Sequence, residues 1–228
     1  MCGRFTLVKE KKQIEERFDA KFDGDLFRKN YNSAPGSFLP VITNDQPKSI
    51  QPYHWGLVPS WAKNMQMAFK TINARKETIQ EKPAFKFAYD YQRCLVLADG
   101  YYEWKMYGKN KVPYRITLKN DSLFAMAGLW EKWEQSNGNT LHSFSIVTMP
   151  AISNIAHIHD RMPVILSRIN EQKWLDTEIF GKQMYDELVA PPASDIKFYT
   201  VSQKVNKADN NAAELIEPHA HSIQGSLF

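Results

Sequence analysis

The feature that most constrains this chain is a run of short extended segments through its middle. Each is rich in β-branched and aromatic residues and is bounded by turn-forming residues, as strands are: Arg93–Ala98, Tyr101–Met106, Tyr114–Leu118, Leu123–Trp133 and Leu141–Thr148. Between the last two, Ser136-Asn137-Gly138-Asn139 indicates a tight hairpin, because Asn and Gly adopt the positive φ angles of such turns. Strands joined by short turns pair antiparallel. The sequence therefore predicts a mainly antiparallel sheet that forms a barrel-like core.

Further strands and helices are predicted on both sides of this run. They are extended segments at Ser37–Thr43, Ser49–Leu57, Pro163–Leu166 and Lys197–Val205, and helical segments at Val8–Phe18, Ala74–Tyr91 with a break at Pro83, Glu171–Leu175 and Lys182–Val189. No internal repeat or linker interrupts the chain. We therefore expect one α+β domain over residues 1–228, with helices flanking the sheet and the tail after about residue 206 unassigned.

The composition is that of an ordinary globular protein, with 43% hydrophobic residues in a chain of 228. The two cysteines, Cys2 and Cys94, give no disulfide framework, and no cluster of Cys and His has zinc-ligand spacing. The opening soon becomes charged, at Lys9-Glu10-Lys11-Lys12, and no apolar run approaches the ~18 residues of a membrane helix. We therefore expect a cytoplasmic monomer without signal peptide, membrane segment, metal or cofactor. Its net charge of +4 tolerates an anionic partner.

One of the two cysteines directly follows the initiator methionine. A residue as small as Cys2 usually permits removal of Met1, which would leave a free α-amine and a thiol on the same residue. These groups titrate near pH ~8 and ~8.5, so both are partly nucleophilic in a cell. Such an aminothiol suits amide hydrolysis, with the amine as base, or capture of an aldehyde as a five-membered thiazolidine. A cysteine at position 2 also occurs without any function, so Cys2 alone decides nothing.

Three other stretches contain groups that suit catalysis, and each also has an ordinary explanation. Asn73 precedes a helical pattern, where Asn is a favoured N-cap. Asp99-Gly100 is typical of a hairpin turn, with Glu103 as a solvated strand residue. His159 is equally consistent with a hydrogen-bonded core histidine, and Cys94, within an apolar run, with a buried small hydrophobe.

Taken together and in this order, five motifs resemble the SOS response-associated peptidase (SRAP) family of abasic-site processing proteins. They are CGRF at residues 2–5, WGLVPSW at 55–61, NARKE at 73–77, ADGYYEWK at 98–105 and HDRMPVIL at 159–166. The resemblance extends from Cys2 to at least Val205. It implies a protein that binds abasic sites in single-stranded DNA and links to them covalently through its N-terminal cysteine, which shields the lesion. An opened abasic sugar presents an aldehyde, the electrophile that an aminothiol captures best.

The resemblance also implies a role for each residue of the site. Cys2 would be the nucleophile, and Asn73 would hold its terminus through the side-chain amide. Glu103 would shuttle protons, which requires a carboxyl group whose pKa is raised by burial. His159 would assist opening of the sugar ring, or the reverse reaction, as a general acid or base. An imine that the thiol does not intercept tends toward β-elimination, so lyase activity is expected as a side reaction.

The same stretches supply groups suited to single-stranded DNA. Arg4, Arg75 and Arg161 each lie two positions from a proposed catalytic residue, where their guanidinium groups would hold phosphates beside the lesion. The rings of Trp55, Trp61 and Trp104 are candidates for stacking on bases, at ~1–3 kcal/mol per base. We expect at least one of the three tryptophans to pack in the core instead.

Three other functions remain open from the sequence. An N-terminal-nucleophile amidohydrolase would also use Cys2, but it needs oxyanion donors, and the only Asn-Gly pair lies in the expected hairpin turn. A peptidase would pair Cys2 with His159. A non-enzymatic binding protein would hold intact and abasic single strands equally well. Glutaminase activity tests the first alternative, and a covalent product with abasic DNA excludes the third.

Overall fold

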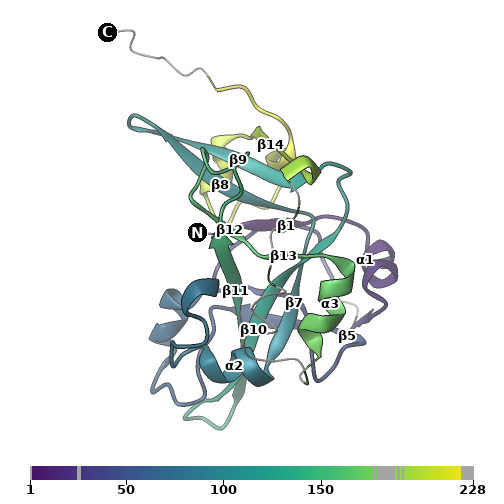
Figure 1. The fold of residues 1–228 in the computed structure, drawn as a ribbon, viewed down its shortest axis with the longest axis vertical. Coiled ribbons are helices and arrows are strands. Elements are labelled where there is room, and N and C mark those ends of the chain that lie inside the picture. The colour runs from purple at the N-terminus through teal and green to yellow at the C-terminus, as the bar shows by residue number, and fades with distance from the viewer. Residues whose placement is uncertain are drawn as a thin grey trace.

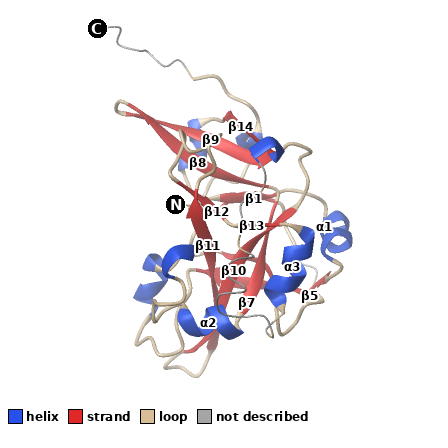
Figure 2. Ribbon diagram, in the orientation of Figure 1, coloured by secondary structure: helices blue, strands red, loops and turns tan. Residues whose placement is uncertain are grey.

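The computed structural model describes residues 2–24, 27–176, 178, 188, 191 and 193–221. Most of the regular structure in these residues is β-strand, and the helices lie on the outside of the sheets (Figure 1, Figure 2). The strands are β1 (Phe5–Leu7), β2 (Lys21–Phe22), β3 (Asn30–Ser33), β4 (Phe38–Thr43), β5 (Ser49–Trp55), β6 (Asn73–Arg75), β7 (Arg93–Ala98), β8 (Gly100–Tyr107), β9 (Asn110–Leu118), β10 (Phe124–Glu134), β11 (Thr140–Pro150), β12 (Arg161–Pro163), β13 (Ile165–Leu166) and β14 (Ile196–Thr200). The α-helices are α1 (Lys11–Phe18), α2 (Lys86–Tyr91) and α3 (Arg168–Leu175), and the short 3-10 helices are η1 (Met65–Lys70), η2 (Lys76–Thr78), η3 (Ala193–Asp195), η4 (Gln203–Asn206) and η5 (Ala213–Ile216).

Five strands close into a barrel. The strands β11, β10, β7, β4 and β5 are antiparallel neighbours in that order, and β5 returns to pair in parallel with β11. Alternate residues on all five strands, among them Val41, Trp55, Val96 and Phe144, form one buried cluster that also contains Cys2. The opposite faces of the strands pack against the helices, as Trp174 of α3 shows. The expected α+β fold, with a mainly antiparallel barrel-like core and flanking helices, is confirmed.

A second sheet adjoins the barrel, with strand order β14-β9-β8-β1-β3. In Figure 1 this sheet lies above the barrel strands, and its strand β1 is seen below β8 and β9, next to the barrel. The chain passes from the barrel to the second sheet at Asp99-Gly100, so the expected hairpin turn there is wrong: β7 and β8 belong to different sheets. The buried Asp99 carboxylate instead accepts hydrogen bonds from the Thr6 hydroxyl at 2.6 Å and an Arg115 guanidinium nitrogen at 3.0 Å. These contacts hold the junction between the barrel and the second sheet.

Most other elements agree with the sequence, with differences at their ends. The hairpin between β10 and β11 is confirmed, with Gly138 at φ +82°. The helix expected from Val8 begins three residues later, at Lys11. The strand expected to reach Val205 ends at Thr200, and η4 begins at Gln203. The prediction over Lys182–Val189 falls outside the described residues, apart from Leu188. Within the described part of the chain, no helix is long and apolar enough to span a bilayer.

Candidate active site

Two of the sequence motifs meet on one strand. On one side of β11, the parallel strand β6 places Asn73 opposite Ile146 and Arg75 opposite Thr148. On the other side, the antiparallel strand β12 places Arg161 opposite Pro150. The prediction of Asn73 as a helix N-cap is therefore wrong, because pairing with β11 makes residues 73–75 a strand. Segments far apart in the sequence are thus joined at the end of β11.

The Cys2 side chain is fully buried at this end of the barrel. It belongs to the cluster that contains Phe5, Trp55 and Tyr101, and its Sγ lies 4.0 Å from the carbonyl oxygen of Arg4. Burial raises the pKa of the Cys2 thiol far above its ordinary value, and the nearby Glu103 carboxylate raises it further. The thiol is therefore neutral at neutral pH, and any reaction through its sulfur needs a group that removes the proton or stabilises the thiolate.

Glu103 of β8 and His159 face each other beside Cys2. Glu103 is 3% exposed, and burial raises the pKa of its carboxyl group to about 8. The His159 Nε2 atom lies 3.9 Å from a Glu103 oxygen, while Nδ1 accepts a hydrogen bond of 2.9 Å from the backbone N–H of Arg161. Burial lowers the pKa of His159, an effect that the carboxylate of Asp160 partly opposes. At neutral pH the pair is therefore a largely protonated carboxyl group and a neutral imidazole. The Arg161 N–H favours the tautomer with its proton on Nε2, whereas an Asp160 oxygen, 3.0 Å from Nδ1, favours a proton on Nδ1.

Asn73 offers an acceptor to the same region. Its Nδ2 donates to the carbonyl oxygen of Ile72 at 3.0 Å, whereas its Oδ1 is buried and has no hydrogen-bond partner among the described residues. Its strand neighbour Ile146 packs in the cluster that contains Cys2. The described side chains show no hydrogen bond from Asn73 to Cys2, Glu103 or His159. Asn73 is therefore placed by its strand beside the cluster that contains Cys2, with an oxygen left to accept a hydrogen bond.

The three predicted phosphate-binding arginines have different surroundings. Arg161 is buried and forms a bidentate ion pair with Glu77, and it also donates to the Thr148 carbonyl oxygen at 2.7 Å. Half-buried Arg4 donates to the Asn32 side chain at 2.7 Å and to a backbone carbonyl at 2.9 Å. Arg75 is exposed. Because desolvated guanidinium groups already engaged by the protein are poorly placed to gain a phosphate, Arg75 is best suited to the expected role.

The three tryptophans proposed to stack on bases differ in their exposure to solvent. Trp55 is fully buried with its ring 5.2 Å from that of Phe5, so the expectation that it stacks on DNA is wrong. Trp61 is 57% exposed. Trp104 is half-buried, its indole N–H donates to the Asn206 side chain at 2.7 Å, and the ammonium of Lys111 lies 5.1 Å from its ring centre. Trp61 and Trp104 thus remain candidates for contacts with bases.

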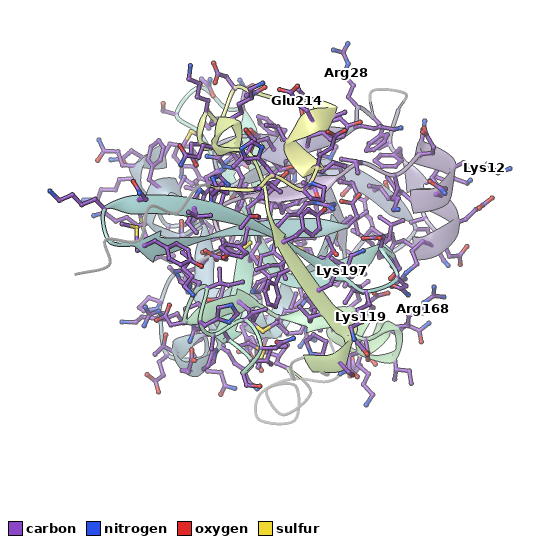
Figure 3. All side chains as sticks on the ribbon, turned by 90° about the horizontal axis from the view of Figure 1, so that it is seen from above. Lys12, Arg28, Lys119, Arg168, Lys197 and Glu214 are labelled. Carbon is purple, nitrogen blue, oxygen red and sulfur yellow. The ribbon has the colours of Figure 1, made fainter. Side chains whose placement is uncertain are left out.

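Charge elsewhere on the molecule is distributed over many elements. The exposed basic side chains labelled in Figure 3 come from separate parts of the fold, with Lys12 on α1, Lys119 after β9 and Arg168 on α3. Some exposed lysines are paired, as Lys204 is with Glu214 at 2.8 Å. In the described part of the chain, no group of three or more His, Cys, Asp and Glu side chains is arranged to hold a metal.

Glu77 is a member of the site region to which sequence reasoning assigned no role. It neutralises Arg161, which lies 84 positions along the chain, and this pairing lowers the pKa of the Glu77 carboxyl group. The NARKE motif contains Glu77, but nothing local identifies its partner. Only the arrangement of β6 and β12 on the two sides of β11 brings the pair together.

The chain as a whole, whose barrel holds the buried Cys2 beside Glu103 and His159, is similar to known proteins of one family. Residues 1–208 match the SRAP (SOS response associated peptidase) family, and the chain belongs to that family. It is 42% identical over 224 residues to the abasic site processing protein YoqW of Bacillus subtilis (strain 168), with 96% of this chain and 100% of YoqW covered.

Similarity extends to a mammalian relative and to a solved structure. The abasic site processing protein HMCES of Mus musculus is 34% identical over 271 residues, which cover 96% of this chain and 76% of HMCES. A crystal structure of a Bacteroides thetaiotaomicron protein superposes with a TM-score of 0.88 at 27% identity and covers 96% of this chain and 100% of its own. The fold described above is therefore that of known structures.

Proposed function

We propose that the protein, once Met1 is removed, binds single-stranded DNA at abasic sites and links to them through Cys2. The observation that carries this proposal is the grouping of the Cys2 thiol with the Glu103 carboxyl and the His159 imidazole, from separate segments of the chain. The names of YoqW and HMCES, both abasic site processing proteins, support the choice of substrate. Their similarity to this chain covers nearly its whole length.

The proposed reaction has two covalent steps. The α-amine of Cys2 attacks the aldehyde of the opened sugar, and loss of one water gives an imine. The sulfur then forms a bond to the imine carbon, and the thiol proton is transferred, through a carrier, to the nitrogen. The product is a thiazolidine, formed with release of one water and without any oxidant or reductant. Ring closure competes with β-elimination of the imine, so the thiol protects the DNA strand from cleavage.

The site residues have the properties that these steps require. With its pKa raised to about 8, Glu103 is largely protonated at neutral pH and can donate a proton to the departing water. Its carboxylate then accepts the proton that the thiol loses. In the tautomer that the Arg161 N–H favours, the neutral His159 can donate its Nε2 proton to the sugar oxygen as the ring opens. The unpartnered Oδ1 of Asn73 can accept a hydrogen bond from the α-amine and orient it.

DNA binding is proposed to use the groups that the fold leaves accessible. Arg75 is exposed on the strand that carries Asn73, where its guanidinium can reach a phosphate beside the lesion. The exposed ring of Trp61 can stack on a neighbouring base. Neither contact depends on base identity, which suits a protein that must act at damage in any sequence.

The two hydrolase alternatives have less support from the site. A Cys–His peptidase needs an imidazole that accepts the thiol proton. Here the Nε2 of His159 faces Glu103 and its Nδ1 already accepts the Arg161 N–H, while burial keeps the thiol protonated. For the amidohydrolase, the Asn-Gly pair lies in the β10–β11 hairpin turn. We therefore prefer aldehyde capture.

The decisive experiment compares protein that begins at Cys2 with protein that retains Met1. Each is incubated with a single-stranded oligonucleotide containing one abasic site and run on a denaturing gel. We expect a heat-stable shifted band only when Cys2 is the first residue, because an amide nitrogen has no basic lone pair to attack the aldehyde. The same oligonucleotide with an intact base is the control.

A Cys2→Ser variant separates the two covalent steps. Because it keeps the α-amine, it is expected to form an imine that borohydride traps, without a heat-stable band before reduction. Robust linkage by protein that mass spectrometry shows to retain Met1 would refute the proposed mechanism. A stable, unreduced adduct with Cys2→Ala would refute the role of the thiol.

A further inference from the structure

A buried hydroxyl group beside Cys2 lacks a hydrogen-bond partner. Tyr101 is fully buried, and its hydroxyl makes no hydrogen bond with any described residue. A buried polar group that is left unpaired costs free energy, so such a group needs a reason. The neighbouring Tyr102 shows the ordinary arrangement, since its hydroxyl donates to the Tyr31 carbonyl oxygen at 2.9 Å.

Strand geometry directs Tyr101 toward the site. Side chains alternate along a strand, so Tyr101 and Glu103 share one face of β8 while Tyr102 points to the other. Tyr101 lies opposite Phe5 of β1 and packs in the cluster that contains Cys2, whereas Tyr102 packs with Val201 and other residues of the C-terminal segment. The Tyr101 hydroxyl is within electrostatic range of both the Cys2 thiol and the Glu103 carboxyl group.

The Cys2 thiol needs a hydrogen-bond donor that stabilises its thiolate form, and the Tyr101 hydroxyl is such a donor. Burial and the Glu103 carboxylate both disfavour a thiolate at Cys2, although ring closure requires the sulfur to give up its proton. A hydrogen-bond donor aimed at the sulfur would favour the charged form. Burial also raises the pKa of Tyr101 well above its ordinary value, so the phenol stays protonated and can act only as a neutral donor or acceptor.

We propose that Tyr101 is a positioning residue for Cys2, and that its hydroxyl donates a hydrogen bond to the sulfur as the thiol loses its proton. This inference rests on the proposed function for its purpose, but the effect of Tyr101 on ionisation of the Cys2 thiol can be measured in the free protein. Tyr101 and Cys2 both have no exposed surface, so Tyr101 acts through the cysteine and not on the DNA.

The variant Tyr101→Phe tests this role without disturbing the fold. It removes one unpaired hydroxyl and keeps the ring, so its stability is expected to equal or exceed that of the wild type. Tyr102→Phe is the matched control, because it removes a neighbouring hydroxyl from the opposite face of the same strand. Both are prepared with Cys2 as the first residue.

The first measurement requires no DNA. The rate at which methyl methanethiosulfonate modifies Cys2 is followed by peptide mass spectrometry as a function of pH, with Cys94 in the same samples as an internal reference. Because the thiolate is the reactive form, Tyr101→Phe is expected to slow modification of Cys2 about tenfold at pH 8, the effect of removing one hydrogen bond to a charged group. The rate profile should shift to higher pH, while Cys94 and the Tyr102→Phe protein are unchanged.

The second measurement uses abasic single-stranded DNA. Tyr101→Phe is expected to slow formation of the heat-stable adduct by a similar factor, with borohydride-trapped imine and DNA affinity unchanged. Wild-type thiol reactivity in Tyr101→Phe would overturn the inference, as would an equal loss in Tyr102→Phe or an equal loss of imine formation. If the wild type itself forms no adduct, the proposed function fails, and the thiol measurement alone still decides the role of Tyr101.

Discussion

The raised pKa of Glu103 predicts how the free energy of unfolding changes with pH. Its carboxyl group is 3% exposed and has a pKa of about 8 in the folded protein, whereas an unfolded glutamate titrates near 4.5. The folded state therefore holds this proton more tightly than the unfolded state does. Below pH ~4.5 both states are protonated and Glu103 costs nothing; as the pH rises toward 8 only the unfolded state ionises, and stability is lost progressively.

The size of this loss follows from the two pKa values. Each pH unit between them costs ~1.4 kcal/mol, so three units from pH 5 to pH 8 would cost ~4 kcal/mol. Partial titration of both states at the ends of this range reduces the difference to ~3 kcal/mol. Glu103→Gln keeps the shape and removes the titration. Its stability relative to the wild type is therefore expected to rise by ~3 kcal/mol between pH 5 and pH 8 and to level off above that.

Urea unfolding at several pH values measures this difference directly. Comparing the wild type with Glu103→Gln at the same pH cancels the contributions of other titrating groups. Linkage to abasic DNA is measured on the same samples, where Glu103→Gln is expected to react slowly and to bind DNA with nearly wild-type affinity. A constant stability difference across the range would refute the raised pKa, and a parallel loss of binding and linkage would make Glu103 a structural residue.

Two further predictions concern Arg75, on the strand that carries Asn73, and Glu131, elsewhere on the barrel strand β10. Arg75→Gln is expected to weaken binding to all single strands alike and to lower the salt slope by ~0.7, the contribution of one neutralised phosphate, as measured by titrations at several salt concentrations; an unchanged slope would place Arg75 away from the DNA. Burial raises the pKa of Glu131 to about 7, so Glu131→Gln is expected to stabilise the fold by up to ~3 kcal/mol at pH 8 and by much less at pH 5 in urea unfolding. Equal effects at both pH values would contradict this.

The local sequence pattern was sufficient to predict the strands that make up the barrel. The bounds predicted for β7, Arg93–Ala98, are those that it has, because an apolar run between turn-forming residues is a strong strand signal. The β10–β11 hairpin followed from its Asn-Gly turn. The residues of the site came from the resemblance to a family, since nothing local distinguishes Glu103 from a solvated strand residue.

What could not be predicted depends on contacts between distant segments. The propensity of Asn for helix N-caps suggested one role for Asn73, but pairing of residues 73–75 with β11 overrode it. Asp99-Gly100 has hairpin chemistry, yet the Asp99 carboxylate binds Thr6 and Arg115 and directs the chain into another sheet. The sequence does not show that Trp55 is buried and Trp61 exposed, because the burial of Trp55 results from the pairing of β5 with β11 that closes the barrel.

Cys2 is buried because the residues that follow it are held by strand pairing and hydrogen bonds. Chain termini are usually poorly ordered unless they are tied down. Here β1 pairs with β8 on one side and β3 on the other, Arg4 donates to the Val205 carbonyl oxygen, and the Thr6 hydroxyl donates to Asp99. These anchors belong to segments spread over the whole chain, so Cys2 reaches its place only when both sheets have formed. A free aminothiol reacts with any aldehyde; in the proposed function, this burial makes reaction depend on a substrate that the folded site admits.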